Sequence, residues 1–358
     1  MTAELLENIS LQPLNTLRFD VAARYLAVID DVESLTALLA DSTVARLRKF
    51  VLGGGSNVLF SKDFDGIVLK MNIKGIAKTF EDDSVVHLEV GAGEEWQKTV
   101  EYAVANGWGG IENLAMVPGT AGAAPIQNIA CYGHNLHETL VYADAICAAT
   151  GRVKRFSAEE CKFGYRSSVF NGELKGQYIL VRIAVRLQKY PVLNTSYRSR
   201  YESVEDEMAK GSSPPYAVAD VYRAIINIRQ RKLPAVNELG TAGSVFKNPV
   251  ITRSQLSQIQ QICPGIHYYP EQQLTYNDID RTRDSVEPLV KIPAAWLIED
   301  MGWAGRRVGK CGIWKSQPLN IVNYGGATPA EFLALMADVQ EAVLERYGVR
   351  LEPEVVIV

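Results

Sequence analysis

A run of three glycines is the first segment of this sequence whose residue types suggest ligand chemistry. The segment GGGSNV at 53–58 presents consecutive backbone N–H groups with few side chains in the way, and such a turn can wrap a diphosphate. It is neither a dinucleotide fingerprint nor a P-loop, because the chain contains no G-x-G-x-x-G and no Gly-Lys-Ser/Thr follows the glycines. A plain turn between strands is the alternative reading, and the glycines alone do not decide between the two.

A second segment of small residues, PGTAGAAP at 118–125, is followed by the hydrogen-bonding side chains of Gln127, Asn128 and Tyr132. Two such segments in one chain suggest a long ligand that lies across both of them. Tight packing between sheets also requires small residues, so it is the alternative explanation.

Four other residues carry side chains suited to a reaction. The guanidinium of Arg166 can grip a carboxylate or a phosphate with two parallel hydrogen bonds, although most arginines are solvated surface groups. The hydroxyl of Ser244 could give a proton to a carbanion or bind a ligand, and the chain lacks the G-x-S-x-G elbow of a hydrolase serine. Glu352 and Glu354 lie two residues apart near the end of the sequence, and one of them can face a pocket, although a pair of ordinary surface carboxylates is the alternative.

The histidines and cysteines do not suggest a metal site. His134 and His137 lie three residues apart, but no HExxH pattern or third ligand accompanies them, so a polar surface face is expected. The cysteine count is 5, and no two cysteines form a C-x-x-C. An odd number at these spacings excludes a disulfide framework or a zinc finger and indicates reduced thiols.

Composition places the chain among ordinary soluble globular proteins. It has 358 residues, 47% of them apolar, and a formal net charge of −4, which gives no reason to expect binding of nucleic acid. The longest stretch without Asp, Glu, Lys or Arg, 113–137, contains prolines and glycines that argue against insertion in a membrane. The N-terminus lacks a basic region and an apolar core, so we expect a cytoplasmic protein.

The elements that must position these residues can be read from periodicity and caps. The glycine turn lies between strands expected at 50–52 and 66–71, after a helix capped by Asp31. In a second section we expect strands at 85–90, 141–148, 152–156 and 178–187. We also expect a helix at 94–105 and a short helix that begins with a capping box formed by Ser157 and Glu160.

The remaining part of the chain begins with a polar, irregular stretch at 189–215, which resembles an insertion or a lid. Asp220 is expected to cap a helix at 221–231. Further expected elements are helices near 254–262 and 293–301, a strand at 320–322, a final helix opened by Thr328, Pro329 and Glu331, and a strand at 351–358.

Taken together and in order, the motifs carry a resemblance that none of them carries alone. They are GGGSNVLF at 53–60, NLAMVPGTAGAAPIQNIACYG at 113–133, FGYRSS at 163–168, GTAGSVFKNP at 240–249 and LEPEV at 351–355. This set resembles the UDP-N-acetylenolpyruvoylglucosamine reductase family over nearly the whole chain. The stretch around Tyr197 resembles the type of this family that has an extra loop over the substrate.

The resemblance implies an α+β fold in which FAD lies between two subdomains of the vanillyl-alcohol-oxidase-like class, with a third α+β domain that binds the substrate. We expect the first FAD-binding subdomain at 1–71, joined by 351–358, and the second at 72–218, including the substrate loop at 189–215. The substrate-binding domain is expected at 219–350.

The resemblance also assigns roles to residues. In the family, NADPH reduces the flavin, which then gives hydride to the methylene carbon of an enolpyruvyl group. Three positions match the catalytic set: Arg166 for the developing charge, Ser244 as proton donor and Glu354 to polarise the reacting group. The FAD-binding matches are Gly53, Gly54, Gly55, Ser56, Asn57, Val58, Pro118, Gly119, Gly122, Gln127, Asn128 and Tyr132, and the substrate-binding matches are Tyr165, Tyr197, Lys232, Asn248 and Gln317.

The leading hypothesis is therefore an NADPH-dependent flavoenzyme that acts on a UDP-sugar in the synthesis of peptidoglycan precursors, as a monomer and without a metal. One alternative is another FAD-dependent oxidoreductase of the same fold. The other is a nucleotide-sugar-binding protein without catalysis, which the presence of Arg166, Ser244 and Glu354 disfavours.

Overall fold

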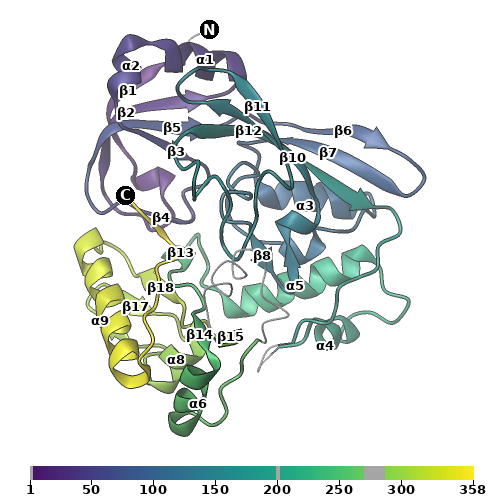
Figure 1. Ribbon diagram of the computed structural model, residues 1–358, viewed down its shortest axis with the longest axis vertical. Helices are drawn as coiled ribbons and strands as arrows, with labels where there is room; N and C mark the ends of the chain where they lie inside the picture. Colours follow the sequence, from purple (N-terminus) through teal and green to yellow (C-terminus); the bar gives the residue numbers. More distant parts are fainter. Residues whose placement is uncertain (1–2, 199–201, 270–286) are drawn as a thin grey trace. The chain divides into compact units, whose positions relative to one another are not determined.

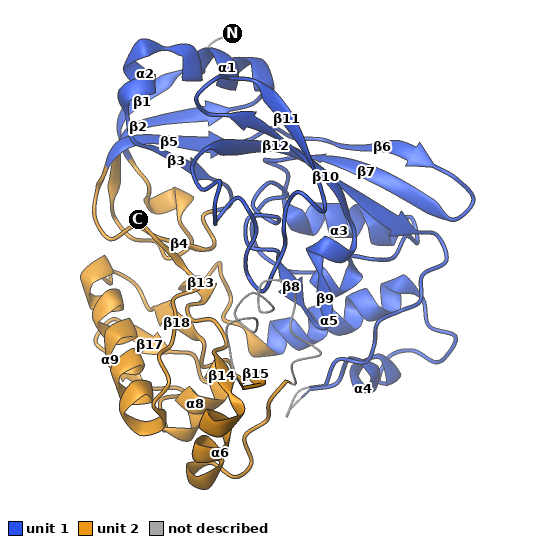
Figure 2. Ribbon diagram, in the orientation of Figure 1, with its two compact units in different colours: residues 1–9, 24–54, 65–231 blue, residues 10–23, 55–64, 232–358 orange. Residues whose placement is uncertain are grey.

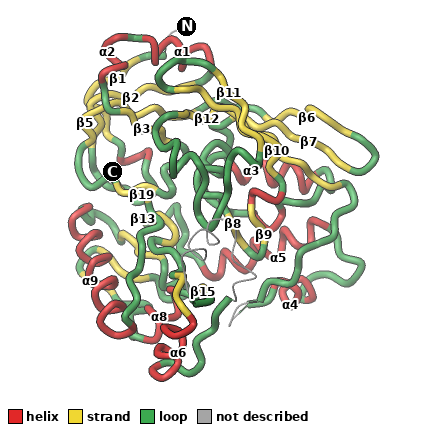
Figure 3. Tube along the Cα trace, viewed as in Figure 1, coloured by secondary structure: helices red, strands yellow, loops and turns green. Residues whose placement is uncertain are grey.

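The computed structural model describes residues 3–198, 202–269 and 287–358 and contains helices and strands throughout (Figures 1 and 3). The chain divides into two compact units that are not continuous in sequence (Figure 2). Unit 1 comprises residues 1–9, 24–54 and 65–231, and unit 2 comprises residues 10–23, 55–64 and 232–358. The predicted domain boundaries at 71/72 and 218/219 remain a prediction. None of the described helices is long and apolar enough to cross a bilayer.

A four-stranded sheet with the order β1-β2-β5-β3 lies mostly in unit 1. Its strands are β1 (Leu5–Ser10), β2 (Ala22–Ile29), β3 (Lys49–Leu52) and β5 (Phe64–Met71). Helix α1 (Val32–Ala40) begins where the Asp31 carboxylate accepts the Ser34 N–H at 2.6 Å, and α2 (Ser42–Arg46) follows it. Leu35 of α1 and Ile67 of β5 belong to one buried core, so α1 packs on this sheet.

The second sheet of unit 1 has five strands in the order β11-β10-β12-β7-β6, and every neighbouring pair is antiparallel. The strands are β6 (Ile76–Glu81), β7 (Val85–Gly91), β10 (Leu140–Cys147), β11 (Val153–Ser157) and β12 (Tyr178–Gln188). Helices α3 (Trp96–Ala105) and α5 (Val218–Lys232) share a buried core with this sheet. Short elements between them are η2 (Glu112–Leu114), β8 (Ala130–Cys131), β9 (His134–Asn135), η3 (Leu136–Glu138) and α4 (Val204–Ala209).

Unit 2 contains a four-stranded sheet with the order β13-β18-β17-β16. Its strands are β13 (Gly240–Ser244), β16 (Arg307–Val308), β17 (Cys311–Ile313) and β18 (Asn320–Asn323). Its helices are η1 (Gln12–Leu14), α6 (Arg253–Ile262), α8 (Ala294–Asp300) and α9 (Pro329–Tyr347). Two further strand pairs complete it: β14 (Val250–Thr252) with β15 (Leu289–Lys291), and β19 (Val356–Ile357) with β4 (Val58–Leu59).

Most predicted elements are confirmed, and the errors have local causes. Ser157 and Glu160 do exchange both capping hydrogen bonds, at 2.9 and 3.2 Å, but the residues after them form turns instead of a helix. Asp220 is not the N-cap of α5, because its carboxylate accepts the Ala217 N–H from inside the first turn, so α5 begins earlier. The expected strand at 351–358 is reduced to β19, and β1, β2 and β6 were not predicted.

The predicted irregular stretch at 189–215 contains helix α4, which the sequence analysis missed; its residues 199–201 lie outside the described residues. Ser203 caps α4 by accepting the Asp206 N–H. Glu207 of α4 is buried and receives two hydrogen bonds from Arg231 of α5, at 2.8 and 2.7 Å, and one from Lys210 at 2.7 Å. The hydrogen bonds from Arg231 are the main reason that the pKa of Glu207 is lowered from its ordinary value of 4.5 to about 2.

We therefore expect Glu207→Gln to lower the free energy of unfolding at pH 7 by about 1–3 kcal/mol, the range for hydrogen bonds to a charged group. Because the folded pKa lies below the unfolded one, this stabilisation is present above pH 4.5 and is lost as the pH falls toward 2. Urea unfolding followed by circular dichroism at several pH values measures the difference.

Glu205→Gln is the matched control for this experiment, since Glu205 lies on the same helix with its side chain 58% exposed and pairs with Arg198 on the surface. It should change stability by no more than about 0.5 kcal/mol. Equal losses in the two variants, or a Glu207 effect that is constant from pH 7 to pH 3, would contradict the role assigned to this ion pair.

Candidate active site

The two glycine-rich segments of the sequence lie against each other in unit 1. A Cβ atom added to Gly53 would lie 2.6 Å from Thr120 Oγ1, and one added to Gly54 would lie 2.8 Å from Gly119 Cα. Both distances are shorter than real Cβ contacts, so side chains are excluded at these positions. The two segments are thus neighbours, and the prediction that a long ligand lies across both of them stays a prediction.

Two polar groups beside this contact are suited to an anion. Lys70 Nζ of β5 donates a hydrogen bond to the Gly53 carbonyl, and burial, with a smaller contribution from Lys74, lowers the pKa of Lys70. The hydroxyl of Thr120, a residue that is 7% exposed, is buried and has no hydrogen-bond partner among the described residues. A buried hydroxyl and an ammonium beside a side-chain-free turn fit the diphosphate of a dinucleotide cofactor. Neither Lys70 nor Thr120 was singled out from the sequence.

The following residues of the turn belong to unit 2 and are fixed by Thr16. Gly55 has φ +67°, and a Cβ there would lie 2.0 Å from the Leu14 carbonyl oxygen, so only glycine fits. The Thr16 N–H donates to the Gly55 carbonyl at 3.0 Å, and the Thr16 hydroxyl donates to the Thr241 carbonyl at 2.5 Å. Thr16 thus joins the turn to β13. Nothing in its sequence surroundings marks it, because both partners are distant along the chain.

Ser244 stands at the end of β13, where the strand is irregular. Gly243 has φ +71°, and the register with β18 shifts between Thr241 and Ser244 before Ser244 pairs with Asn320. Such bulges change the direction in which a side chain points. Ser244 is half-buried at this position.

Glu354 is brought to Ser244 by backbone hydrogen bonds within unit 2. Its N–H donates to the carbonyl of Val245, the residue after Ser244, at 2.8 Å, and its carbonyl accepts the Asn57 amide at 3.3 Å. Glu354 is half-buried, whereas Glu352 is exposed and lies 3.8 Å from Lys247 Nζ. The structure therefore brings together three predicted site residues, Asn57, Ser244 and Glu354.

Three predicted substrate-binding residues lie in the same unit. The Trp314 indole donates to the Lys232 carbonyl at 2.9 Å, and the Trp314 N–H donates to the carbonyl of Asn320, the partner of Ser244, at 2.8 Å. Gln317 lies in the turn before Asn320 and accepts its N–H at 2.9 Å. Lys232 and Gln317 are thus connected to the strand that pairs with Ser244. The third, Asn248, accepts the first N–H of α8, that of Ala294, at 3.0 Å.

Arg166 lies in unit 1, in a turn whose residues Gly164 and Ser167 exchange backbone hydrogen bonds at 3.0 and 3.3 Å. Its φ is +55°, in the left-handed region, and its Nη1 donates to the Ala130 carbonyl at 3.3 Å. Its neighbour Tyr165, a predicted substrate-binding residue, is half-buried.

Tyr132 and Tyr197 also meet in unit 1, with ring centroids 5.1 Å apart in an edge-to-face arrangement. Burial raises the pKa of Tyr132 well above its usual range. Asn113 ties the two segments together, because its amide donates to the carbonyls of Tyr132 and Asn194, both at 2.9 Å. Arg166, Tyr132 and Tyr197 therefore lie around the β8–β9 hairpin.

The other predicted FAD-binding positions differ in burial. Gly122 is buried, and a Cβ there would lie 2.5 Å from the Ala92 Cβ, so this glycine is required for packing against the end of β7. Gln127 is half-buried and Pro118 is exposed. Asn128 is buried, and its amide bonds to residues of unit 1 at 137 and 164.

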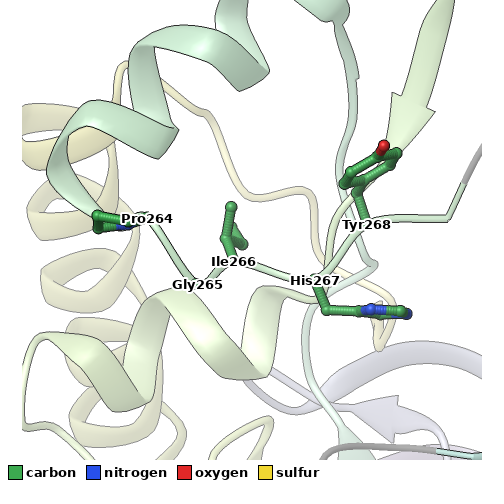
Figure 4. Close-up of a pocket in the computed structure, with 5 residues that line it drawn as sticks. All are labelled: Pro264, Gly265, Ile266, His267 and Tyr268. Carbon is green, nitrogen blue, oxygen red and sulfur yellow. The ribbon is translucent and has the colours of Figure 1, made fainter.

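Two further features lie outside the candidate site. A surface hollow of about 450 Å³ is lined by Pro264–Tyr268, beside α6 in unit 2 (Figure 4), and contains none of the predicted site residues. His134 and His137 are both partly buried, so the expected polar surface face is wrong. Within residues 3–198, 202–269 and 287–358, no cluster of three or more His, Cys, Asp or Glu side chains could hold a metal ion.

The fold and the paired glycine segments define a flavoprotein, since residues 23–157 match the FAD binding domain family. Residues 234–358 match the family described as UDP-N-acetylenolpyruvoylglucosamine reductase, C-terminal domain. The chain belongs to the UDP-N-acetylenolpyruvoylglucosamine reductase family, as the resemblance predicted.

Relatives named UDP-N-acetylenolpyruvoylglucosamine reductase support this membership over the full length. The one from Amoebophilus asiaticus is 42% identical over 355 residues, which cover 99% of both chains. The one from Flavobacterium johnsoniae is 38% identical over 355 residues, covering 99% of this chain and 100% of the relative. A crystal structure of the Thermus caldophilus reductase, 22% identical, matches with a TM-score of 0.64 over 100% of this chain and 99% of that one. The predicted α+β fold class is confirmed.

We expect Gly54→Ala to weaken the binding of FAD at least tenfold, because the new methyl group would lie 2.8 Å from backbone and force the two glycine segments apart. Titration of the apoprotein with FAD, followed by the quenching of flavin fluorescence, gives the Kd. Gly211→Ala is the matched control, since a Cβ at Gly211 meets nothing within 4 Å and should leave the Kd unchanged. Equal FAD affinity in the two variants would show that the close approach is irrelevant to the cofactor.

Proposed function

We propose that this chain reduces the enolpyruvyl double bond of UDP-N-acetylenolpyruvoylglucosamine to give UDP-N-acetylmuramate, with FAD as cofactor and NADPH as reductant. Family membership over the full length supports the reaction. The observation that carries the site is the backbone attachment of Glu354 to both Val245 and Asn57. These bonds support a site that combines Ser244, the candidate proton donor, with the Glu354 carboxylate and with Asn57 of the predicted cofactor-binding turn.

The predicted FAD-binding residues at 53–58 and 118–127, with Tyr132, are proposed to hold FAD, whereas the amide of Asn128, the remaining predicted FAD-binding residue, already bonds to the protein at both ends. The side-chain-free approach of Gly53 and Gly54, the Lys70 ammonium and the buried Thr120 hydroxyl fit its diphosphate. When bound and reduced, FAD supplies a hydride to the methylene carbon of the enolpyruvyl group.

Three side chains are proposed to act on the charge that this addition creates. The hydride converts the methylene carbon into a methyl group and leaves the electron pair of the double bond on the adjacent carbon and its carboxylate. The Arg166 guanidinium stabilises that negative charge. The Ser244 hydroxyl gives its proton to the adjacent carbon, which completes the reduction. Glu354 orients and polarises the reacting group.

The UDP-sugar is proposed to contact Tyr165, Tyr197, Lys232, Asn248 and Gln317. An ammonium such as that of Lys232 suits the diphosphate. We propose a cytoplasmic location, in keeping with five cysteines that are all free thiols. We also propose that the enzyme acts as a monomer, with subdomains at 1–71 and 72–218 and a substrate domain at 219–350.

Ser244→Ala should separate the two halves of the reaction, because only protonation of the substrate needs this hydroxyl. The bound flavin should be bleached by NADPH at nearly the parent rate under anaerobic conditions. Its reoxidation by the enolpyruvyl substrate should slow by about 10²–10⁴-fold, the usual contribution of one general acid. Stopped-flow absorbance of the bound flavin measures both rates.

Ser257→Ala provides the control, since Ser257 lies exposed on α6 and its hydroxyl bonds only within the helix, to the Arg253 carbonyl. It should leave both rates unchanged. If Ser244→Ala slowed both halves equally, Ser244 would not be the proton donor.

The two carboxylates near residue 353 give a second internal comparison. Glu354→Gln keeps the size of the side chain but removes its charge, so kcat should fall strongly while FAD stays bound, and KM should change less. Glu352→Gln should be nearly silent, because Glu352 is exposed and its contact with Lys247 is a surface ion pair. Steady-state measurement of kcat and KM for both variants, with one substrate preparation, decides between the two carboxylates. A strongly reduced kcat in Glu352→Gln together with a normal kcat in Glu354→Gln would reverse the assignment.

A further inference from the structure

The backbone of Arg166 is held in a conformation that a non-glycine residue rarely adopts. Its φ of +55° lies in the left-handed region, and such conformations persist only where the surrounding structure imposes them. The residues that impose it therefore also determine where the guanidinium points.

Asn128 holds one end of this turn. The residue is 1% exposed. Its Nδ2 donates to the carbonyl of Gly164 at 3.1 Å, and its Oδ1 accepts the His137 N–H at 3.1 Å. One buried amide thus connects the segment after the second glycine turn, the β8–β9 hairpin region and the start of the Arg166 turn.

Ser168 and Asn171 hold the other end. The Ser168 hydroxyl donates to the Ile126 carbonyl at 2.8 Å, and the Ser168 N–H donates to Asn171 Oδ1 at 2.9 Å. Asn171 Nδ2 in turn donates to the carbonyl of Arg166 itself, at 3.1 Å. Hydrogen bonds therefore hold the turn on both sides of Arg166. Two of them, Gly164–Asn128 and Ser168–Ile126, connect the turn to the same segment, 126–128.

We infer that Asn128 is a positioning residue for Arg166 and not a direct ligand of FAD. Because segment 126–128 directly follows the second glycine turn, the position of that turn then determines where the Arg166 guanidinium lies. The inference rests on the proposed role of Arg166 in the reaction. Both polar ends of the Asn128 amide are engaged by the protein, which favours positioning over binding of the cofactor.

The chemical reason lies in the demands of a guanidinium on geometry. Arg166 must meet a planar carboxylate with its fork aligned, and the hydrogen bond from its Nη1 to the Ala130 carbonyl already fixes one direction. Release of the Gly164 end would let the backbone relax from the left-handed region and turn the guanidinium away. Misplacement by about 1 Å can cost about 100-fold in rate.

A double-mutant cycle on the holoenzyme tests this inference, with the variants Asn128→Ala, Arg166→Ala and the pair. The rate of flavin reoxidation by the enolpyruvyl substrate is measured in single turnovers. Asn128→Ala should lower that rate by about 10- to 100-fold, with the Kd for FAD and the rate of flavin reduction by NADPH unchanged. In the Arg166→Ala background, Asn128→Ala should have no further effect, because Asn128 acts through Arg166.

Two variants guard against a loss that is merely structural. Asp31→Ala removes the cap of α1 in the same unit without touching the Arg166 turn, and it should lower Tm while leaving reoxidation unchanged. Asn171→Asp keeps the acceptor for the Ser168 N–H but loses the donor to the Arg166 carbonyl. It should reproduce the slow reoxidation, and it serves if Asn128→Ala does not fold.

The outcomes that overturn the inference are distinct. A weakened Kd for FAD in Asn128→Ala would make Asn128 a cofactor ligand after all. An unchanged Asn128 effect in the Arg166→Ala background would show that Asn128 acts independently of Arg166, and would leave the proposed function standing. A silent Arg166→Ala would remove Arg166 from the reaction, and with it both the proposed site and this inference.

Discussion

Close approaches between backbone segments determine the shape of the turn at 53–57. Gly54 faces Gly119, and Gly55 faces the Leu14 carbonyl, at distances that no side chain would allow. Facing backbone atoms occupy the space that side chains would fill, and the Asn57 amide at the end of the turn donates to the Glu354 carbonyl. A mutation that enlarged this turn would therefore disturb both the proposed cofactor contact and the position of Glu354, the carboxylate that is proposed to be catalytic.

The features that could be predicted from sequence are those whose signals are local. Helix α9 begins as expected because Thr328 and Glu331 exchange both hydrogen bonds of a capping box, and α1 does so because the Asp31 carboxylate accepts the Ser34 N–H. Thr16 could not be found this way, since its partners Gly55 and Thr241 are distant in sequence. The same holds for Lys70 and Thr120, whose meaning depends on which segments approach each other in space.

The residues of the candidate site were predicted from the sequence, but the hydrogen bonds and the bulge that position them were not. Family motifs pointed to Arg166, Ser244 and Glu354, while the bulge at Gly243 and the bonds of Asn171 to the Arg166 turn appear only in three dimensions. The family motif selected Glu354 over Glu352, and Glu354 is the less exposed of the two, although both lie outside the short strand β19. Side-chain chemistry is thus easier to read from sequence than the hydrogen bonds that hold it.

The parallel pairing of β19 with β4 has a consequence for how the protein is made. Asn57 bonds to Glu354 and Ser61 bonds to Val358, and each pair is separated by 297 residues along the chain. Closing loops of this length costs conformational entropy, so pairing of such long range slows folding. A chain whose synthesis stops before residue 354 carries every residue of the glycine turn but lacks the strand that pairs beside it. Such a product also lacks the carboxylate that is proposed to be catalytic, so the glycine turn and that carboxylate are present together only once the C-terminal segment has been made.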